Sequence, residues 1–221
     1  MHLVASFTVL ADMVRQIGGQ YVEVKSLVGP NGDPHTFEPS PQDSVALAKA
    51  DVVIISGLGL EGWMERLIDA SGYKGQVVVA SNGVKTRTME EDGSVITDPH
   101  AWNSMANGVI YARNVSESLQ KADPQDAAAI RKQGDAYIQQ LQQLDTQTAA
   151  EFAAIPVAKR HVLTSHDAFG YFGERYGVTF MSPIGLNTDE EASASQVAAL
   201  INQLKTHHIH RYFIEKNQTH P

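Results

Sequence analysis

The sequence contains no cysteine, so neither a disulfide nor a thiolate metal site can form. No apolar run approaches the roughly 20 residues that a helix needs to span a bilayer, and no signal peptide is visible. Basic residues are in the minority, with 17 Lys and Arg against 25 Asp and Glu. A net charge of −8 without a basic cluster argues against a nucleic-acid partner, because phosphate neutralisation needs clustered cations.

The composition leaves room for a metal-binding protein. The 221 residues suffice for one large domain or two small ones with a buried core. Nine histidines are many for this length. Without cysteine, any metal must be bound through His, Asp or Glu.

Short apolar runs alternate with helical patterns in the first half of the chain. Continuous apolar strands separated by helices predict a parallel sheet that is covered on both faces. Ser40 is a suitable N-cap and Pro41 a suitable first residue for one of these helices. The polar stretch at 85–97 is predicted to be a surface loop. The expected strands are 3–7, 22–28, 51–56 and 76–80, and the expected helices are 9–17, 40–49, 62–70 and 104–121.

A long uninterrupted pattern follows. Asp123 and Pro124 can start a helix, and no further proline occurs until Pro156. Such a helix would be about 48 Å long at 1.5 Å per residue, longer than a small domain is wide. One long core helix is the alternative, but the strand and helix pattern resumes directly afterwards. The later strands are expected at 161–165, 178–181 and 211–215, with helices at 167–176 and 193–205.

These patterns predict an α/β fold with two parallel-sheet lobes bridged by one long helix. The expected divisions are an N-terminal lobe at 1–122, the linking helix at 123–156, and a C-terminal lobe at 157–221. With only three strands, the second lobe is expected to be incomplete.

Three histidines occupy comparable places in this pattern. His35 and His100 each follow an Asp-Pro pair and precede a helix, and His166 follows a strand. In open α/β sheets, ligands bind at the carboxyl ends of the strands. Imidazole nitrogens suit zinc, and three of them leave a fourth coordination position open.

Four segments of the chain resemble one family. The runs DPHTFEPSP, DPHAW, SHDAFGYF and PIGLNTDEEASASQVAALI are similar to those of the metal-specific solute-binding proteins of ABC importers, the zinc- and manganese-binding group. The resemblance extends over essentially the whole chain. It implies two α/β lobes joined by a long helix, with a metal ion held between them by His35, His100 and His166. It also implies delivery to an ABC membrane permease, in the periplasm or from a lipid anchor outside the cytoplasmic membrane.

The third ligand position separates the subtypes of that family. Histidine there goes with zinc-type members and glutamate with manganese-type members, so His166 predicts zinc, with manganese or iron as the alternative. The family's fourth ligand, an Asp, is expected beyond residue 221. Water or a neighbouring group such as His220 then fills that position. Many zinc-type members carry a His-rich acidic loop, whereas the acidic stretch 85–97 contains no histidine.

Two other functions are compatible with part of this pattern. Three histidines with a bound water also form catalytic zinc sites, which would make the protein a zinc hydrolase. The sequence has no HExxH helix, and we therefore expect no enzyme. Some relatives are labelled adhesins, but no residue of this sequence indicates adhesion.

Several further residues have a functional and a structural interpretation. His207, His208 and His210 could bind metal, or they could lie at a solvated helix end. Asp98 and Asp167 could orient the neighbouring histidines or cap helices, and Trp102 and Phe37 could wall the site or lie in the core. Gly57-Leu58-Gly59 lacks the remaining glycines and the lysine of a phosphate loop, and His161 is interpreted as structural.

Overall fold

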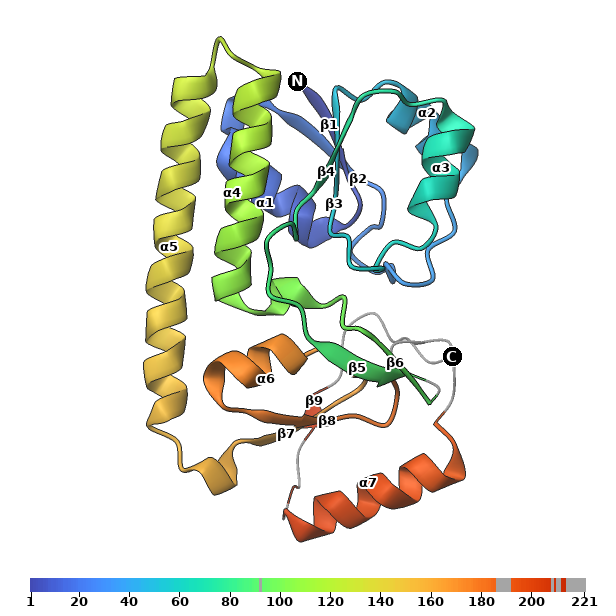
Figure 1. Ribbon diagram of the computed structural model, residues 1–221, viewed down its shortest axis with the longest axis vertical. Helices are drawn as coiled ribbons and strands as arrows, with labels where there is room; N and C mark the ends of the chain where they lie inside the picture. Colours follow the sequence, from blue (N-terminus) through green and yellow to red (C-terminus); the bar gives the residue numbers. More distant parts are fainter. Residues whose placement is uncertain (92, 186–191, 208, 210–211, 214–221) are drawn as a thin grey trace.

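The computed structural model describes residues 1–91, 93–185, 192–207, 209 and 212–213. The chain forms two lobes, and two long helices run along one side of the molecule (Figure 1). The first lobe contains β1 (His2–Ala5), α1 (Thr8–Gly18), β2 (Glu23–Ser26), α2 (Pro41–Ala48), β3 (Val52–Ile55), α3 (Met64–Ser71), β4 (Gln76–Val79) and α4 (Met105–Ala122).

The sheet of the first lobe is entirely parallel, as the apolar runs predicted. Its strand order is β2-β1-β3-β4, and Leu3 is paired with both Val24 and Val52. Figure 1 shows α1 and α4 on one side of this sheet and α2 and α3 on the other. In the same view, the carboxyl ends of the strands face the second lobe.

Apolar periodicity explains the packing of this lobe. Leu10, Val14 and Ile17 follow one another at helical spacing in α1 and are fully buried. Fully burying such a side chain contributes about 1.5–3 kcal/mol to stability. At the start of α2, the amide of Ser40 donates to the Asp43 carboxylate at 2.9 Å, which satisfies one of the amides left free at the helix end.

The long helix is α5 (Ala127–Ala153), about 40 Å in length. It begins four residues later than the sequence predicted. Asp123 Oδ1 does accept the amide of Asp126 at 3.3 Å, as an N-cap would. The turn that contains Pro124 is not α-helical, however, and regular helix starts only after Asp126.

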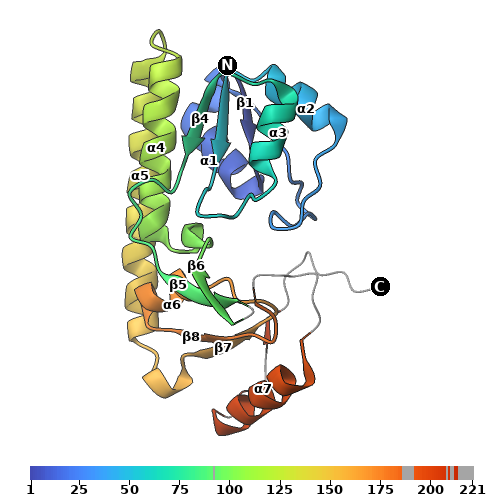
Figure 2. The ribbon, with the colours of Figure 1, turned by 45° about the vertical axis from the view of Figure 1, so that its right-hand side comes forward.

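Both lobes contact α5. It packs along α1 and α4 in the first lobe and along α6 (Gly170–Tyr176) in the second (Figure 2). Ile130 is buried in the first core, and the ring of Phe152 lies 5.4 Å from that of Phe172 in the second lobe. Within α5, Leu144 is 44% exposed, whereas its neighbour Asp145 is buried.

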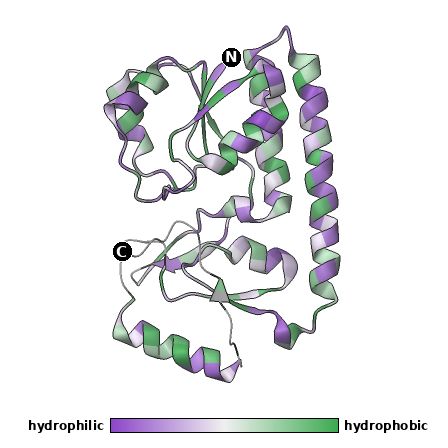
Figure 3. Ribbon diagram, turned by 180° about the vertical axis from the view of Figure 1, so that it is seen from behind, coloured by the Kyte–Doolittle hydropathy of each residue, from purple (hydrophilic) through white to green (hydrophobic). Residues whose placement is uncertain are grey.

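The second lobe has a smaller parallel sheet. Its strands are β7 (His161–Thr164), β8 (Thr179–Met181) and β9 (Tyr212–Phe213), in the order β8-β7-β9. The helix α6 lies on the side toward the first lobe, and α7 (Ala194–Thr206) lies on the opposite side (Figure 1). Hydrophobic residues run along α7 in Figure 3, and Val197 and Ile201 remain exposed. The strand expected at 211–215 lies partly outside the described residues.

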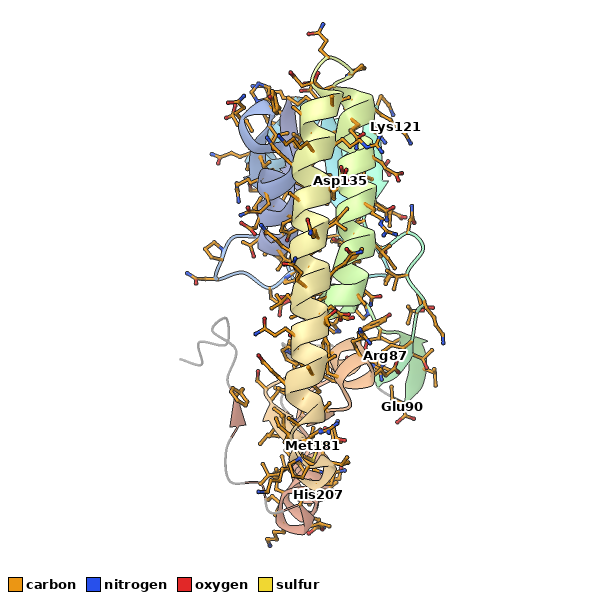
Figure 4. All side chains as sticks on the ribbon, turned by 90° about the vertical axis from the view of Figure 1, so that its left-hand side faces the viewer. Arg87, Glu90, Lys121, Asp135, Met181 and His207 are labelled. Carbon is orange, nitrogen blue, oxygen red and sulfur yellow. The ribbon has the colours of Figure 1, made fainter. Side chains whose placement is uncertain are left out.

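The stretch 85–97 is a β-hairpin, so the surface loop predicted there is wrong. β5 (Thr88–Glu91) and β6 (Ser94–Thr97) pair antiparallel, and Gly93 turns the chain with a φ of +73°. Met89 is buried, but Glu90 and Glu91 follow it directly and hide the alternation in the sequence. Figure 4 shows Arg87 and Glu90 at the level of the second lobe, although they precede α4 in sequence.

Candidate metal centre

The three predicted histidines come together between the lobes. Each offers one ring nitrogen, and these three atoms lie within 4.8 Å of one another. The ring centroids of His100 and His166 are 5.4 Å apart, and the Nε2 atoms of His35 and His100 are 3.0 Å apart. Among the described residues, no other group of three or more His, Asp or Glu side chains is close enough to share one ion.

His35 is held by the loop between β2 and α2. Asp33 Oδ1 accepts the backbone amide of His35 at 2.8 Å. The indole of Trp63 donates to the carbonyl of Pro34 at 2.8 Å. Phe37 packs edge-on against Trp63 at 4.8 Å between ring centroids. Phe37 therefore supports the loop and does not line the pocket around the histidines.

His100 follows the hairpin and is 1% exposed. Asp98 Oδ1 accepts both the backbone amide of His100, at 3.0 Å, and its Nδ1, at 2.8 Å. A carboxylate can only accept hydrogen bonds, so the neutral imidazole of His100 must carry its proton on Nδ1. The lone pair of its Nε2 then points toward His35. Asp98 thus orients His100 and does not cap α4, whose N-cap is Ser104.

Asp98 is itself fully buried. Burial alone would raise its pKa, but the hydrogen bonds from His100 and from Arg87 outweigh burial and hold the pKa below its ordinary value. Asp98 is therefore an anion beside the candidate site at neutral pH. This negative charge would stabilise a cation placed on the His100 ring.

His166 follows the end of β7 at Thr164, with Ser165 between them. Its carbonyl accepts the Thr164 hydroxyl and the Ala168 amide, each at 3.1 Å, and the residue bridges to Ile184. Asp167 lines a separate pocket between the hairpin and α7. Burial raises the pKa of Asp167, and the nearby charge of Asp98 raises it further.

The three imidazoles line a pocket of about 210 Å³. The ring of Trp102 lies 5.5 Å from that of His100 and 4.9 Å from that of Phe7, and both Trp102 and Phe169 line the pocket. Asp33 supplies a polar edge. Aromatic walls around polar groups are typical of ligand sites that limit access by water.

The other candidate residues do not join this site. The rings of His161 and His207 stack at 4.2 Å between centroids, at the far end of β7. His208, His210 and His220 lie outside the described residues. The amides of Ser56 and Gly57 donate to Glu61 at 2.7 and 3.0 Å, so the first amide of the Gly57–Gly59 turn and the amide before it are already used inside the protein.

Comparisons with known proteins agree with a metal-binding protein of a transporter. The family profile described as "Zinc-uptake complex component A periplasmic" matches residues 3–221. The chain is 35% identical over 218 residues to the manganese-binding lipoprotein MntA of Bacillus subtilis, covering 98% of this chain and 71% of MntA. It is 33% identical over 226 residues to the iron ABC transporter substrate-binding lipoprotein MtsA of Streptococcus pyogenes, covering 98% and 72%.

Solved structures agree with the fold. The periplasmic zinc binding protein TroA from Treponema pallidum matches with a TM-score of 0.91 and 30% identity, over 99% of this chain and 79% of TroA. The Mn-bound periplasmic metal binding protein from Candidatus Liberibacter asiaticus matches with a TM-score of 0.85 and 26% identity, over 99% and 80%.

The fold and the matches together define a substrate-binding protein of a metal ABC transporter and not an enzyme. The chain belongs to the family of periplasmic metal-binding proteins of ABC importers that this profile describes. Its relatives are periplasmic proteins or lipoproteins, and membership places the chain outside the cytoplasmic membrane. Among the described helices, none is both long and apolar enough to cross a membrane.

Proposed function

We propose that this chain captures a divalent transition metal ion, zinc in preference to manganese or iron, and delivers it to an ABC-type membrane permease. His35, His100 and His166 are the protein ligands. The observation that carries the proposal is the convergence of three imidazoles, from both lobes, on one point within a pocket.

The spacing of the nitrogens supports a tetrahedral ion. Zinc–nitrogen bonds of about 2.0–2.1 Å place two ligand nitrogens about 3.3 Å apart in a tetrahedron. The Nε2 atoms of His35 and His100 are already 3.0 Å apart. The ligand nitrogen of His166 lies within 4.8 Å of both, and water or a further group takes the fourth position.

The ligand type supports zinc. All three side chains offer nitrogen, whereas manganese favours carboxylate oxygen and stands at the weak end of the affinity order. The relatives carry names for manganese, iron and zinc, so the family alone leaves the metal open. Manganese is the alternative cargo.

The two lobes support capture followed by release. His35 lies in the loop between β2 and α2 of the first lobe, His100 lies between β6 and α4, and His166 follows β7, the first strand of the second sheet. A small separation of the lobes moves His166 away from His35. Docking on a permease that favours the separated arrangement would then release the ion.

A competition titration tests this proposal. The chelator-stripped protein is titrated with zinc, manganese and iron(II) against a chromophoric chelator, and bound metal is counted by elemental analysis. We expect one tightly bound zinc per chain, lost in His35→Ala, His100→Ala and His166→Ala. His2→Ala is the matched control, because the His2 imidazole is exposed and pairs with the exposed Glu23 carboxylate. Unchanged zinc binding in His100→Ala would overturn the assignment.

A further inference from the structure

The carboxylate of Asp98 joins His100 to a second charged residue. Its Oδ1 accepts the Nδ1 of His100, and its Oδ2 accepts Nη1 of Arg87. Arg87 and Asp98 face each other across the base of the hairpin, where the Asp98 amide donates to the Arg87 carbonyl at 3.0 Å. The hairpin therefore fixes the guanidinium beside the carboxylate that orients His100.

The same guanidinium reaches the second lobe. Nε of Arg87 donates to Glu174 Oε1 in α6 at 2.9 Å. Tyr171, also in α6, donates its hydroxyl to the Asp98 carbonyl at 2.7 Å and accepts the Arg87 amide at 3.3 Å. A Cβ atom at Gly170 would lie 1.7 Å from Nη1 of Arg87, so the first residue of α6 must be glycine for the guanidinium to lie there.

We propose that Arg87 is a positioning residue that couples the placement of α6 to the orientation of the His100 ring. This inference rests on the proposed function, since it concerns how one ligand of that site is held. The helix α6 begins four residues after His166, the ligand from the second lobe. The contacts of α6 with Arg87 and Asp98 therefore link the segment that carries His166 to His100, the most buried of the three ligands.

The chemistry of the guanidinium explains why an arginine stands here. Its planar fork presents several N–H donors in fixed directions and can bridge two carboxylates at once. A lysine is a point charge on a flexible stem and cannot hold Asp98 and Glu174 with defined geometry. Without Arg87, only the amide and ring of His100 hold the Asp98 carboxylate, and the acceptor that sets the tautomer of His100 is fixed less firmly.

The first test compares Arg87→Met with Arg175→Met in the full chain. Arg175 also lies in α6 and pairs with a buried carboxylate, Asp145, but on the side facing α5. We expect zinc affinity, measured by chelator competition, to fall about 10–100-fold in Arg87→Met, the usual effect of losing a partner of a ligating histidine. Arg175→Met should lower thermal stability and keep the zinc affinity of the unchanged protein.

The second test reads the tautomer without any metal. Long-range proton–nitrogen NMR spectra of the metal-free protein should show one imidazole, assigned to His100 by its loss in His100→Ala, with its proton on Nδ1. This signature should be lost or mixed in Arg87→Met and kept in Arg175→Met. Glu174→Gln leaves the Asp98 contact in place, and we expect a smaller loss of affinity from it; it also serves if Arg87→Met fails to fold.

The outcomes separate this inference from the proposed function. If the unchanged protein binds none of the three metals, the proposed function fails, while the NMR comparison still decides the role of Arg87. If the protein binds zinc and both Arg87→Met and Glu174→Gln bind it equally well, with the His100 tautomer unchanged, the positioning role is overturned. Equal losses in Arg87→Met and Arg175→Met would also overturn it, because the effect would then be general destabilisation.

Discussion

The Nε2 atoms of His35 and His100 lie 3.0 Å apart, although 65 positions separate the two residues in the sequence. Both nitrogens point at the same small space, which His166 approaches from the other lobe. Since the Asp98 carboxylate holds the proton of His100 on the opposite ring nitrogen, this space faces a lone pair.

Zinc should stabilise the folded protein in proportion to its affinity. At a free zinc concentration one hundred times the Kd, binding to the native state alone raises the free energy of unfolding by about 2.7 kcal/mol. Thermal denaturation with and without zinc measures this gain. We expect the full gain in His2→Ala and almost none in His100→Ala; an equal gain in the two variants would place the bound ion elsewhere.

Replacing His166 by glutamate should move the preference of the site toward manganese. The substitution exchanges a nitrogen ligand for an anionic oxygen ligand, which manganese favours. We expect the ratio of the zinc and manganese Kd values to change by roughly tenfold, or about 1.4 kcal/mol. Competition titrations of both metals measure the ratio. His166→Gln offers an uncharged oxygen and should weaken zinc binding without a comparable gain for manganese.

The contact between α5 and α6 should make the free energy of unfolding depend on pH in the acidic range. Asp145 accepts Nε of Arg175 at 2.9 Å and the hydroxyl of Tyr176 at 2.8 Å. The Arg175 hydrogen bond, followed by that of Tyr176, holds the pKa of Asp145 below its ordinary value of 3.8, against the effect of burial. Because the folded pKa is depressed, the stabilisation is complete above pH 3.8 and is lost as pH falls through the lower folded value.

The variant Asp145→Asn measures this contribution. We expect it to lower the free energy of unfolding at neutral pH by about 1 kcal/mol, a modest figure because Arg175 is partly exposed. Urea denaturation at a series of pH values should show the two proteins converging as pH falls below 3.8. A difference that stays constant down to pH 2 would mean that charge on Asp145 is not its source.

Close packing between α4 and α5 should make one glycine sensitive to substitution. A Cβ at Gly134 would lie 3.0 Å from Cβ of Ser116, whereas a Cβ at Gly108 meets only Leu141, at 3.7 Å. Gly108→Ala should be neutral or stabilising, because alanine favours a helix. Gly134→Ala should be less stable than Gly108→Ala by about 1–3 kcal/mol. Chemical denaturation of both variants checks this, and equal stabilities would show that the helices can separate without cost.

Much of the fold could be predicted because its signals are local. The apolar runs of β1 and β3, the helical spacing of Leu10, Val14 and Ile17, and the Ser40-Pro41 start of α2 all depend on neighbouring residues. The bridging helix was also predictable, since no proline interrupts it. The hairpin was missed although Asp92-Gly93 between short alternating runs is a common turn signal, because the acidic residues resembled a loop.

The sequence by itself determined the alternation of strands and helices, the exclusion of thiolate ligands, and the three histidines that stand beside strand ends or helix starts. Only the tertiary structure decided which side chains meet. Arg87 reaches Asp98 across the hairpin, and Tyr171 reaches the Asp98 carbonyl over 73 positions in the chain. Local propensities depend on adjacent residues and can be read in order, whereas such contacts arise when the packing of two lobes on one helix brings distant segments together.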